Sequence, residues 1–227
     1  MTQQNSPIDF STEDIPPVLP ILPLFDAALF PKMVLPLVVL QGESIQLIDE
    51  AMAKKRIIGL LFSKKKTNEP IQPDEDLAKV GTSALILKMA KSEENRTHLL
   101  VQGLSRFKVV SFQKGKPYAM AKVENLEDKE KKSKEIEALM SNLSGLFNKI
   151  VKFSPGLPPE IGEMSRSIQE PGILADMIAS TINSSPEEKQ KVLEIVDAKK
   201  RLKEVTRLAN HQLEILELGS KIQTQVK

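Results

Sequence analysis

The sequence predicts an α+β fold: a small curled β-sheet or partly open barrel with one helix, followed by an all-helical part that ends in a long helix. Short apolar segments with alternating side chains and close turns fill the first half of the 227 residues. A dense charge run at 127–134 separates them from segments in which apolar residues recur every three or four positions. We therefore expect a disordered tail at 1–17, a β-rich domain at 18–126 and a helical domain at 127–227.

The segment at 18–39 is strongly apolar but contains four prolines: Pro20, Pro23, Pro31 and Pro36. Each proline lacks a backbone donor and fixes φ, so the segment is unsuited to a buried helix or a long central strand. Two short extended pieces are expected, at 18–24 and 33–40, joined by a bent loop. Leu29 and Phe30 on this loop either pack under the sheet or face a partner, and packing is the commoner case.

One helix and five further strands are expected in the rest of the β-rich part. The helix spans 43–55, where Ile45, Ile48 and Met52 share one side. A polar loop at 64–76 separates the first of these strands from the others. The five strands are expected at 56–62, 83–89, 97–102, 106–112 and 118–123.

Helical spacing dominates the second half of the chain. The charge run at 127–134 is interpreted as the solvated start of a helix whose apolar stripe ends near Val151. A proline-rich break follows it, then a short helix at 161–168 and another that begins at Pro171. A serine cap at Ser185, with proline next and glutamate three residues on, predicts a further helix start.

The last helix is expected to run to residue 227, with a break near Asp197. Gly219 is a candidate end, but Ile222 and Val226 keep the apolar spacing up to the end of the chain. Because a natural helix usually finishes with a cap, we expect this helix to be truncated and the chain to be a fragment of a longer one.

Composition excludes several classes of protein. The net charge is +2, with lysines spread among glutamates, so no one-sided basic face for nucleic acid is indicated. The absence of cysteine excludes disulfides and thiolate metal sites. The first residues lack the features of a signal peptide, and no apolar run reaches the ~20 residues that span a membrane. A soluble cytoplasmic protein is expected.

The sequence offers no reaction centre. The two histidines, His98 and His211, lie on different predicted elements and have no neighbours at metal-ligand spacing. The HExxH, GxxxxGK[ST] and GxSxG motifs do not occur. We therefore expect no catalytic, cofactor-binding or metal-binding residue in this chain.

Several motifs together resemble the N-terminal domain of the Lon family of ATP-dependent proteases. The opening segment is similar to the family's "LPLRD…FP…PL", although Phe25 stands where the family commonly has arginine. The resemblance runs in order from about residue 18 to the end of the chain. The motifs that carry it are Leu22-Pro23-Leu24-Phe25-Asp26, Phe30-Pro31, Pro36-Leu37, Val80-Gly81-Thr82, the segments at 100–106, 171–182 and 189–194, and Arg201-Leu202.

The resemblance implies a non-catalytic N-terminal fragment of a serine endopeptidase. In Lon proteases this region precedes an ATPase module and a peptidase module with a serine–lysine dyad, so ATP and magnesium would be bound by the parent and no cofactor by this fragment. The parent would be a cytoplasmic homohexamer of protein quality control and stress response, and this region would recognise unfolded, damaged or tagged proteins. A stand-alone protein-binding module or a protease adaptor with the same fold is the alternative.

Two sets of candidate contact residues follow. Substrate binding is expected at Phe30, Met33 and Leu35, because a protein that recognises unfolded chains needs apolar surface of its own and methionine adapts to varied partners. The alternative is that these side chains cap the barrel core. Subunit contacts are expected from the narrow stripe of the last helix, unless that stripe packs on the helix at 136–151. The stripe residues are Leu202, Val205, Ala209, Leu213 and Leu216.

Overall fold

The computed structural model describes residues 14–40, 42–65, 70–92, 96–129 and 132–226, which form two compact units. Unit 1 contains the described residues up to Leu24 together with Val34–Asn125. Unit 2 contains Phe25–Met33 and the residues from Leu126 onward. Most of the expected tail at 1–17 lies outside the described residues, but Ile15 is buried with the core of unit 1.

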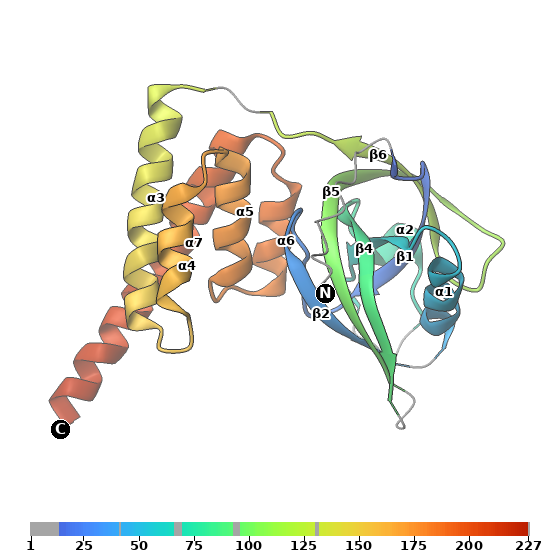
Figure 1. Ribbon diagram of the computed structural model, residues 1–227, viewed down its shortest axis with the longest axis horizontal. Coiled ribbons are helices and arrows are strands. Elements are labelled where there is room, and N and C mark those ends of the chain that lie inside the picture. The colour runs from blue at the N-terminus through green and yellow to red at the C-terminus, as the bar shows by residue number, and fades with distance from the viewer. Residues whose placement is uncertain (1–13, 41, 66–69, 93–95, 130–131, 227) are drawn as a thin grey trace, which may run out of the picture. The chain divides into compact units, whose positions relative to one another are not determined.

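Unit 1 is a curled six-stranded sheet (Figure 1). The strand order is β2-β5-β4-β3-β1-β6, and β5 also pairs with β6, so five of the strands close a circuit and β2 lies outside it. The β1–β3 pair is parallel, and β4 is antiparallel to both β3 and β5. The strands are β1 (Val18–Leu24), β2 (Val34–Val39), β3 (Ile57–Phe62), β4 (Val80–Lys91), β5 (Thr97–Gln113) and β6 (Met120–Leu126).

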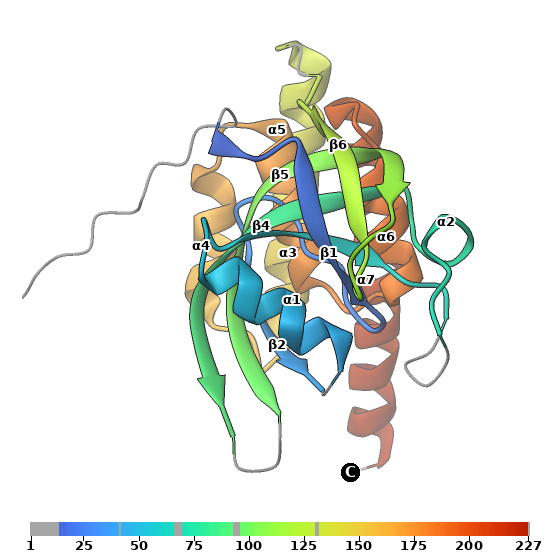
Figure 2. The same ribbon diagram turned by 90° about the vertical axis from the view of Figure 1, so that its right-hand side faces the viewer.

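The core of unit 1 contains side chains from β1, β3, β4, β5 and β6, together with Ile15 and Leu77. Every residue of β3 is buried, and the strand is an interior strand that lies between β1 and β4. Gly59 is closely packed there: a Cβ would stand 2.6 Å from Cδ1 of Ile21, so a larger residue would force neighbouring side chains to shift. Helix α1 (Glu43–Met52) packs beside β1 and buries Leu47, Ile48 and Ala51 (Figure 2).

Two expectations for unit 1 are corrected. The strands predicted at 97–102 and 106–112 are one continuous strand, β5, which pairs with β4 along most of its length. Irregular register at Ser83/Ala84 and Ile86/Lys88 lets the pair bend, and Leu87, at the second irregularity, is exposed. The polar loop at 64–76 also contains a short helix, α2 (Pro73–Asp76).

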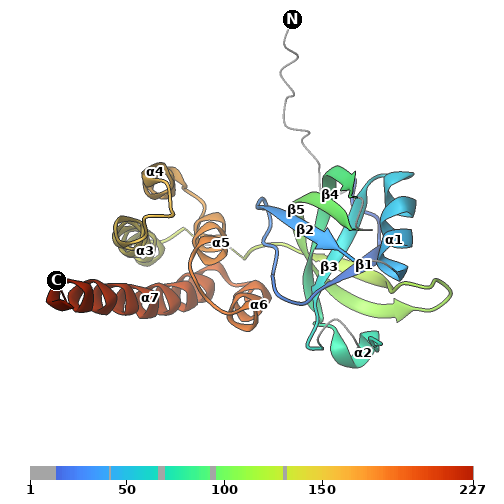
Figure 3. The ribbon, with the colours of Figure 1, turned by 90° about the horizontal axis from the view of Figure 1, so that it is seen from below.

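Unit 2 contains the five helices that follow β6, together with the segment Phe25–Met33. Helix α7 packs against α3 and α5, and α4 lies beside α3 (Figure 3). Phe147 and Ile150 of α3 and Leu202 and Val205 of α7 are fully buried. The helices are α3 (Lys134–Phe153), α4 (Pro159–Ser167), α5 (Pro171–Thr181), α6 (Pro186–Glu194) and α7 (Ala198–Val226).

Helix ends in unit 2 follow local capping chemistry. The predicted start of α6 is confirmed, because Ser185 and Glu188 form a reciprocal capping box. The helix predicted to start in the charge run at 127–134 begins at the end of that run: α3 starts at Lys134, where the Ser133 hydroxyl accepts a hydrogen bond from the Ile136 N–H at 3.2 Å. Just before it, Lys129 instead forms a bridge with Asp197. Among the described helices, none is long and apolar enough to cross a membrane.

Candidate functional site

Strand β2 carries a row of exposed apolar side chains. It pairs with β5 from Val34↔Gln102 to Val39↔Thr97 and has no second partner among the described strands. Val34 and Val38 are 51% and 54% exposed, and Leu40 just beyond the strand is 58% exposed. With the exposed Pro36, these residues make up what we call the β2 row: Val34, Pro36, Val38 and Leu40.

The sequence produces this row by strand alternation on an edge. Successive side chains point to opposite faces of a strand, so the even-numbered residues share the exposed face, while Leu35 and Leu37 are half-buried and Val39 is buried. An edge strand also presents backbone groups that can pair with another chain. Proline is tolerated at such an edge because its missing N–H can face away from the ladder.

The three predicted substrate-binding residues differ in how deeply they are buried. Met33 and Leu35 are half-buried beside the β2 row. Phe30 is fully buried and Leu29 nearly so, which removes Phe30 from any contact surface. The segment that contains Phe30 groups with the helical unit. The chain then turns into β2: Lys32 has a φ of 64°, and the Met33 N–H donates to the Phe30 carbonyl at 3.2 Å.

The predicted subunit-contact stripe on α7 is mostly covered within unit 2. Leu202, Val205 and Ala209 are fully buried and Leu213 is 7% exposed, since α7 packs on α3 and α5. These four side chains are therefore core residues of the unit, as the packing alternative expected, and Leu216 is half-buried.

The last turns of α7 carry different exposed apolar residues. Ile215, Leu218 and Ile222 are between 53% and 60% exposed. Their spacing of three and then four residues places them on one side of the helix. Ile215 and Leu218 fell outside the predicted stripe, although this spacing is visible in the sequence.

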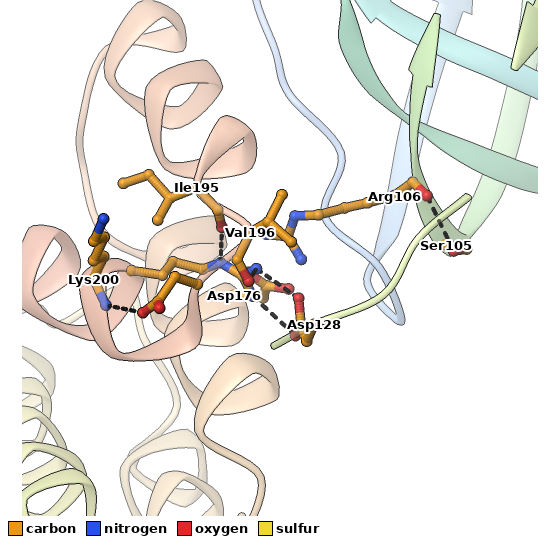
Figure 4. A network of polar contacts seen from close by, with 9 residues as sticks. Ser105, Arg106, Asp128, Asp176, Ile195, Val196 and Lys200 are labelled. Atoms are coloured by element: carbon orange, nitrogen blue, oxygen red, sulfur yellow. Dashed lines mark hydrogen bonds and ion pairs between the residues drawn. The ribbon is translucent and has the colours of Figure 1, made fainter. Parts of the chain in front are cut away.

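A fully buried arginine, Arg201, lies in a polar cluster of unit 2, and Figure 4 labels the acidic residues Asp128 and Asp176 of this cluster. The guanidinium of Arg201 makes a two-pronged pair with Asp128, at 2.6 and 3.0 Å, and lies 3.4 Å from the buried Asp176 carboxylate. Its remaining donors reach the carbonyls of Ile195 at 2.7 Å and Val196 at 3.3 Å. Because all five N–H groups are directed at protein acceptors, this cluster is a structural clamp and offers no free group for chemistry.

A surface network in unit 1 shifts the pKa values of two of its residues, Glu50 and Tyr118. Hydrogen bonds from Lys116 at 2.8 Å, Tyr118 at 2.6 Å and Gln46 lower the pKa of Glu50 to about 2. Partial burial, reinforced by the Glu50 carboxylate, raises the pKa of Tyr118 to about 12. The network ties α1 to the segment before β6, and it keeps both groups in their usual charge states near neutral pH.

The described residues show no arrangement for metal binding. Among them, no group of three or more histidine, cysteine, aspartate or glutamate side chains is placed to hold a metal ion. His98 lies exposed on β5 and His211 lies exposed on α7. The β2 row and the last turns of α7 are two exposed apolar surfaces among the described residues.

Comparison with known proteins gives one consistent family. Residues 18–211 match the family described as the ATP-dependent protease La (LON) substrate-binding domain. The chain is 51% identical over 217 residues to the Lon protease of Desulfosudis oleivorans and 52% identical over 216 residues to that of Syntrophus aciditrophicus. These matches cover 96% and 94% of the chain but only 27% of either relative, so the chain spans about a quarter of their length.

Solved structures show the same fold. The N-terminal domain of the Mycobacterium avium complex Lon protease matches 85% of the chain and 98% of that structure, with a TM-score of 0.70 at 21% identity. A Lon N-terminal domain protein from Xanthomonas campestris matches 83% of the chain and 96% of that structure, with a TM-score of 0.59 at 17% identity.

Proposed function

The chain belongs to the Lon substrate-binding domain family, and from that premise we propose that it binds unfolded or damaged protein segments for a Lon-type ATP-dependent protease. The observation that carries the proposal is the β2 row, an apolar surface on an edge strand. Unfolded segments expose both apolar side chains and unpaired backbone groups, and the edge of β2 is suited to both.

The proposed binding mode is strand addition. An extended segment aligns along β2, forms main-chain hydrogen bonds at its free edge and lays alternate side chains against Val34 and Val38. Met33 and Leu35, half-buried at the same strand, extend the apolar contact. Main-chain hydrogen bonds discriminate little between side chains, which suits a domain that must accept many substrates. Pro36 lacks one donor, which limits pairing between two copies of this strand.

The role in a larger protein is also a proposal. The matched relatives are named Lon proteases, and the chain corresponds to 27% of the first two. We propose that the rest of such a protein binds ATP and magnesium, cuts with a serine–lysine dyad and assembles as a cytoplasmic homohexamer in quality control and stress response. In this arrangement the present chain supplies recognition and no catalytic residue.

A second candidate function, support of assembly, is favoured by the end of α7. Ile215, Leu218 and Ile222 form an exposed apolar side over the last turns of the helix. This face, and not the stripe from Leu202 to Leu213, is the part of the helix available to a neighbouring subunit. The double variant Ile215→Ser/Ile222→Ser should reduce self-association in light scattering at high protein concentration. An unchanged mass distribution would argue against assembly through this face.

The binding proposal is tested by removing apolar area from the β2 row. The double variant Val34→Ser/Val38→Ser should weaken binding of a fluorescently labelled, permanently unfolded protein by roughly tenfold, because two valine contacts are lost. The matched control is Val110→Ser on β5, since Val110 is 49% exposed but lies outside the β2 row. Equal affinity of the double variant and wild type, at unchanged melting temperature, would exclude the β2 row as the binding surface.

A further inference from the structure

A cavity of about 640 Å³ opens within unit 2 between α3, α4 and α5. Its volume falls in the range of roughly 300–1,000 Å³ that is typical of ligand pockets. Ile136 and Met140 of α3 and Leu174 of α5 form an apolar part of the lining. Serine side chains and Gln169 supply polar groups beside them. None of the lining residues belongs to the β2 row, so the cavity is a separate site.

Charges at the cavity favour an anionic group. Lys132, Arg166 and Glu137 line it and are all exposed, which gives two cations against one anion. Within the described part of the chain, neither Lys132 nor Arg166 forms an ion pair, whereas Lys199 and Lys203 both pair with Glu135. A carboxylate next to an apolar side chain would therefore find two available cations beside an apolar lining.

Gly145 leaves the backbone of α3 uncovered beside the cavity. It lies within a 20-residue helix, where glycine costs about 1 kcal/mol relative to alanine. Packing does not require it: a Cβ at Gly145 would meet no atom within 4 Å, whereas a Cβ at Gly162 would stand 2.7 Å from Oδ1 of Asn148. Gly145 is exposed and lines the cavity, so it leaves helix backbone bare at the place where a ligand would lie.

We propose that this cavity binds a short peptide segment in which an apolar side chain stands next to an aspartate or glutamate. The apolar side chain lies between Ile136, Met140 and Leu174, the peptide backbone crosses Gly145, and Lys132 and Arg166 hold the carboxylate. The proposal deepens the proposed function, because the ligand is again a segment of a protein substrate. It adds a sequence preference that strand addition at β2 does not provide.

The test uses the 227-residue chain and two labelled octapeptides, SGELFEGS and SGKLFKGS, in fluorescence anisotropy. The acidic peptide should bind more tightly, and added salt should weaken its binding. Gly145→Met, which places a side chain in the cavity, should weaken binding by about tenfold or more. The matched control is Gly219→Met on α7, another exposed helical glycine with no atom within 4 Å of an added Cβ. It should change affinity by less than about twofold.

A second variant keeps the test decisive if Gly145→Met lowers the melting temperature. Arg166→Glu alters an exposed charge and should weaken the acidic peptide by roughly fivefold while leaving the basic peptide no weaker. Equal binding of both peptides, or full binding by both variants, would overturn the proposal. Binding of octanoate without binding of the acidic peptide would assign the cavity to a small amphipathic anion and would also overturn it. The β2 variant Val34→Ser/Val38→Ser should bind the acidic peptide as wild type does. Failure of the cavity proposal can therefore be distinguished from failure of the proposed binding at β2.

Discussion

Replacing Arg201 by methionine should strongly destabilise unit 2. The guanidinium is fully buried, and it neutralises Asp176, whose side chain is 3% exposed, and Asp128, which is 25% exposed. Methionine preserves much of the apolar stem but removes the charge and five hydrogen bonds. Removal of one partner from a buried ion pair typically costs about 3–5 kcal/mol. Most of this cost should come from Asp176, because water can reach Asp128.

The assay is urea denaturation followed by far-ultraviolet circular dichroism, which reports mainly on the helices. Arg207→Met is the matched control, since Arg207 lies on the same helix but pairs with Glu204 at the surface. Exposed pairs of this kind are worth about 0–1 kcal/mol. We expect Arg201→Met to lose several times more stability than Arg207→Met. Equal losses in the two variants would refute the view that this clamp holds unit 2 together.

A partial rescue checks the source of the loss. Adding Asp176→Leu to Arg201→Met removes the buried anion that the first change leaves behind. Replacement of a buried ionic cluster by apolar residues of similar volume is often neutral or stabilising. The double variant should therefore be more stable than Arg201→Met alone. A double variant that is less stable would show that packing, and not the buried charge, dominates the loss.

Three further predictions concern local features. Ser185→Ala removes a helix cap and should cost about 0.5–2 kcal/mol in urea denaturation, and no loss would contradict the capping role. Gly59→Val forces side-chain atoms against Ile21 and should lower stability by about 1–3 kcal/mol in the same assay, so an unchanged midpoint would show that the core can yield there. Glu50 has a pKa lowered from 4.5 to about 2, so its contribution is complete above pH 4.5 and is lost as the pH falls to about 2. Glu50→Gln should make the melting temperature depend less on pH in this range. A pH dependence that matches wild type would exclude Glu50 as the cause.

Local patterns in the sequence locate most elements of this fold. Prolines limit β1 and β2 to short extended pieces, and the capping residues at Ser185 begin α6 where expected. The continuity of β5 could not be foreseen, because it depends on pairing with β4 and on an irregular register that only the assembled sheet reveals. The exact residue at which α3 starts within the charge run could not be foreseen, because charged residues are compatible with a helix start at any of these positions and the local sequence does not reveal the bridge between Lys129 and Asp197.

The candidate site shows the same division between local and long-range information. Alternation along β2 identifies which side chains share a face, and the sequence already pointed to the neighbouring Met33 and Leu35. Whether a face is covered depends on tertiary packing, and for this reason Phe30 was named as a contact although it is fully buried. The clamp at Arg201 was invisible in the sequence, since Asp128 and Asp176 lie 73 and 25 residues away along the chain.

Site-specific crosslinking tests substrate binding at β2 most directly. The chain has no cysteine, so a single introduced thiol can carry a photoreactive benzophenone group. Val38→Cys places that group in the β2 row, and Val110→Cys places it at a similarly exposed valine on β5. With a labelled unfolded protein as the substrate, the account predicts strong crosslinking from position 38, weak crosslinking from position 110, and competition by unlabelled unfolded protein. Equal yields at the two positions, or no crosslink from position 38, would contradict the claim that β2 is the binding surface.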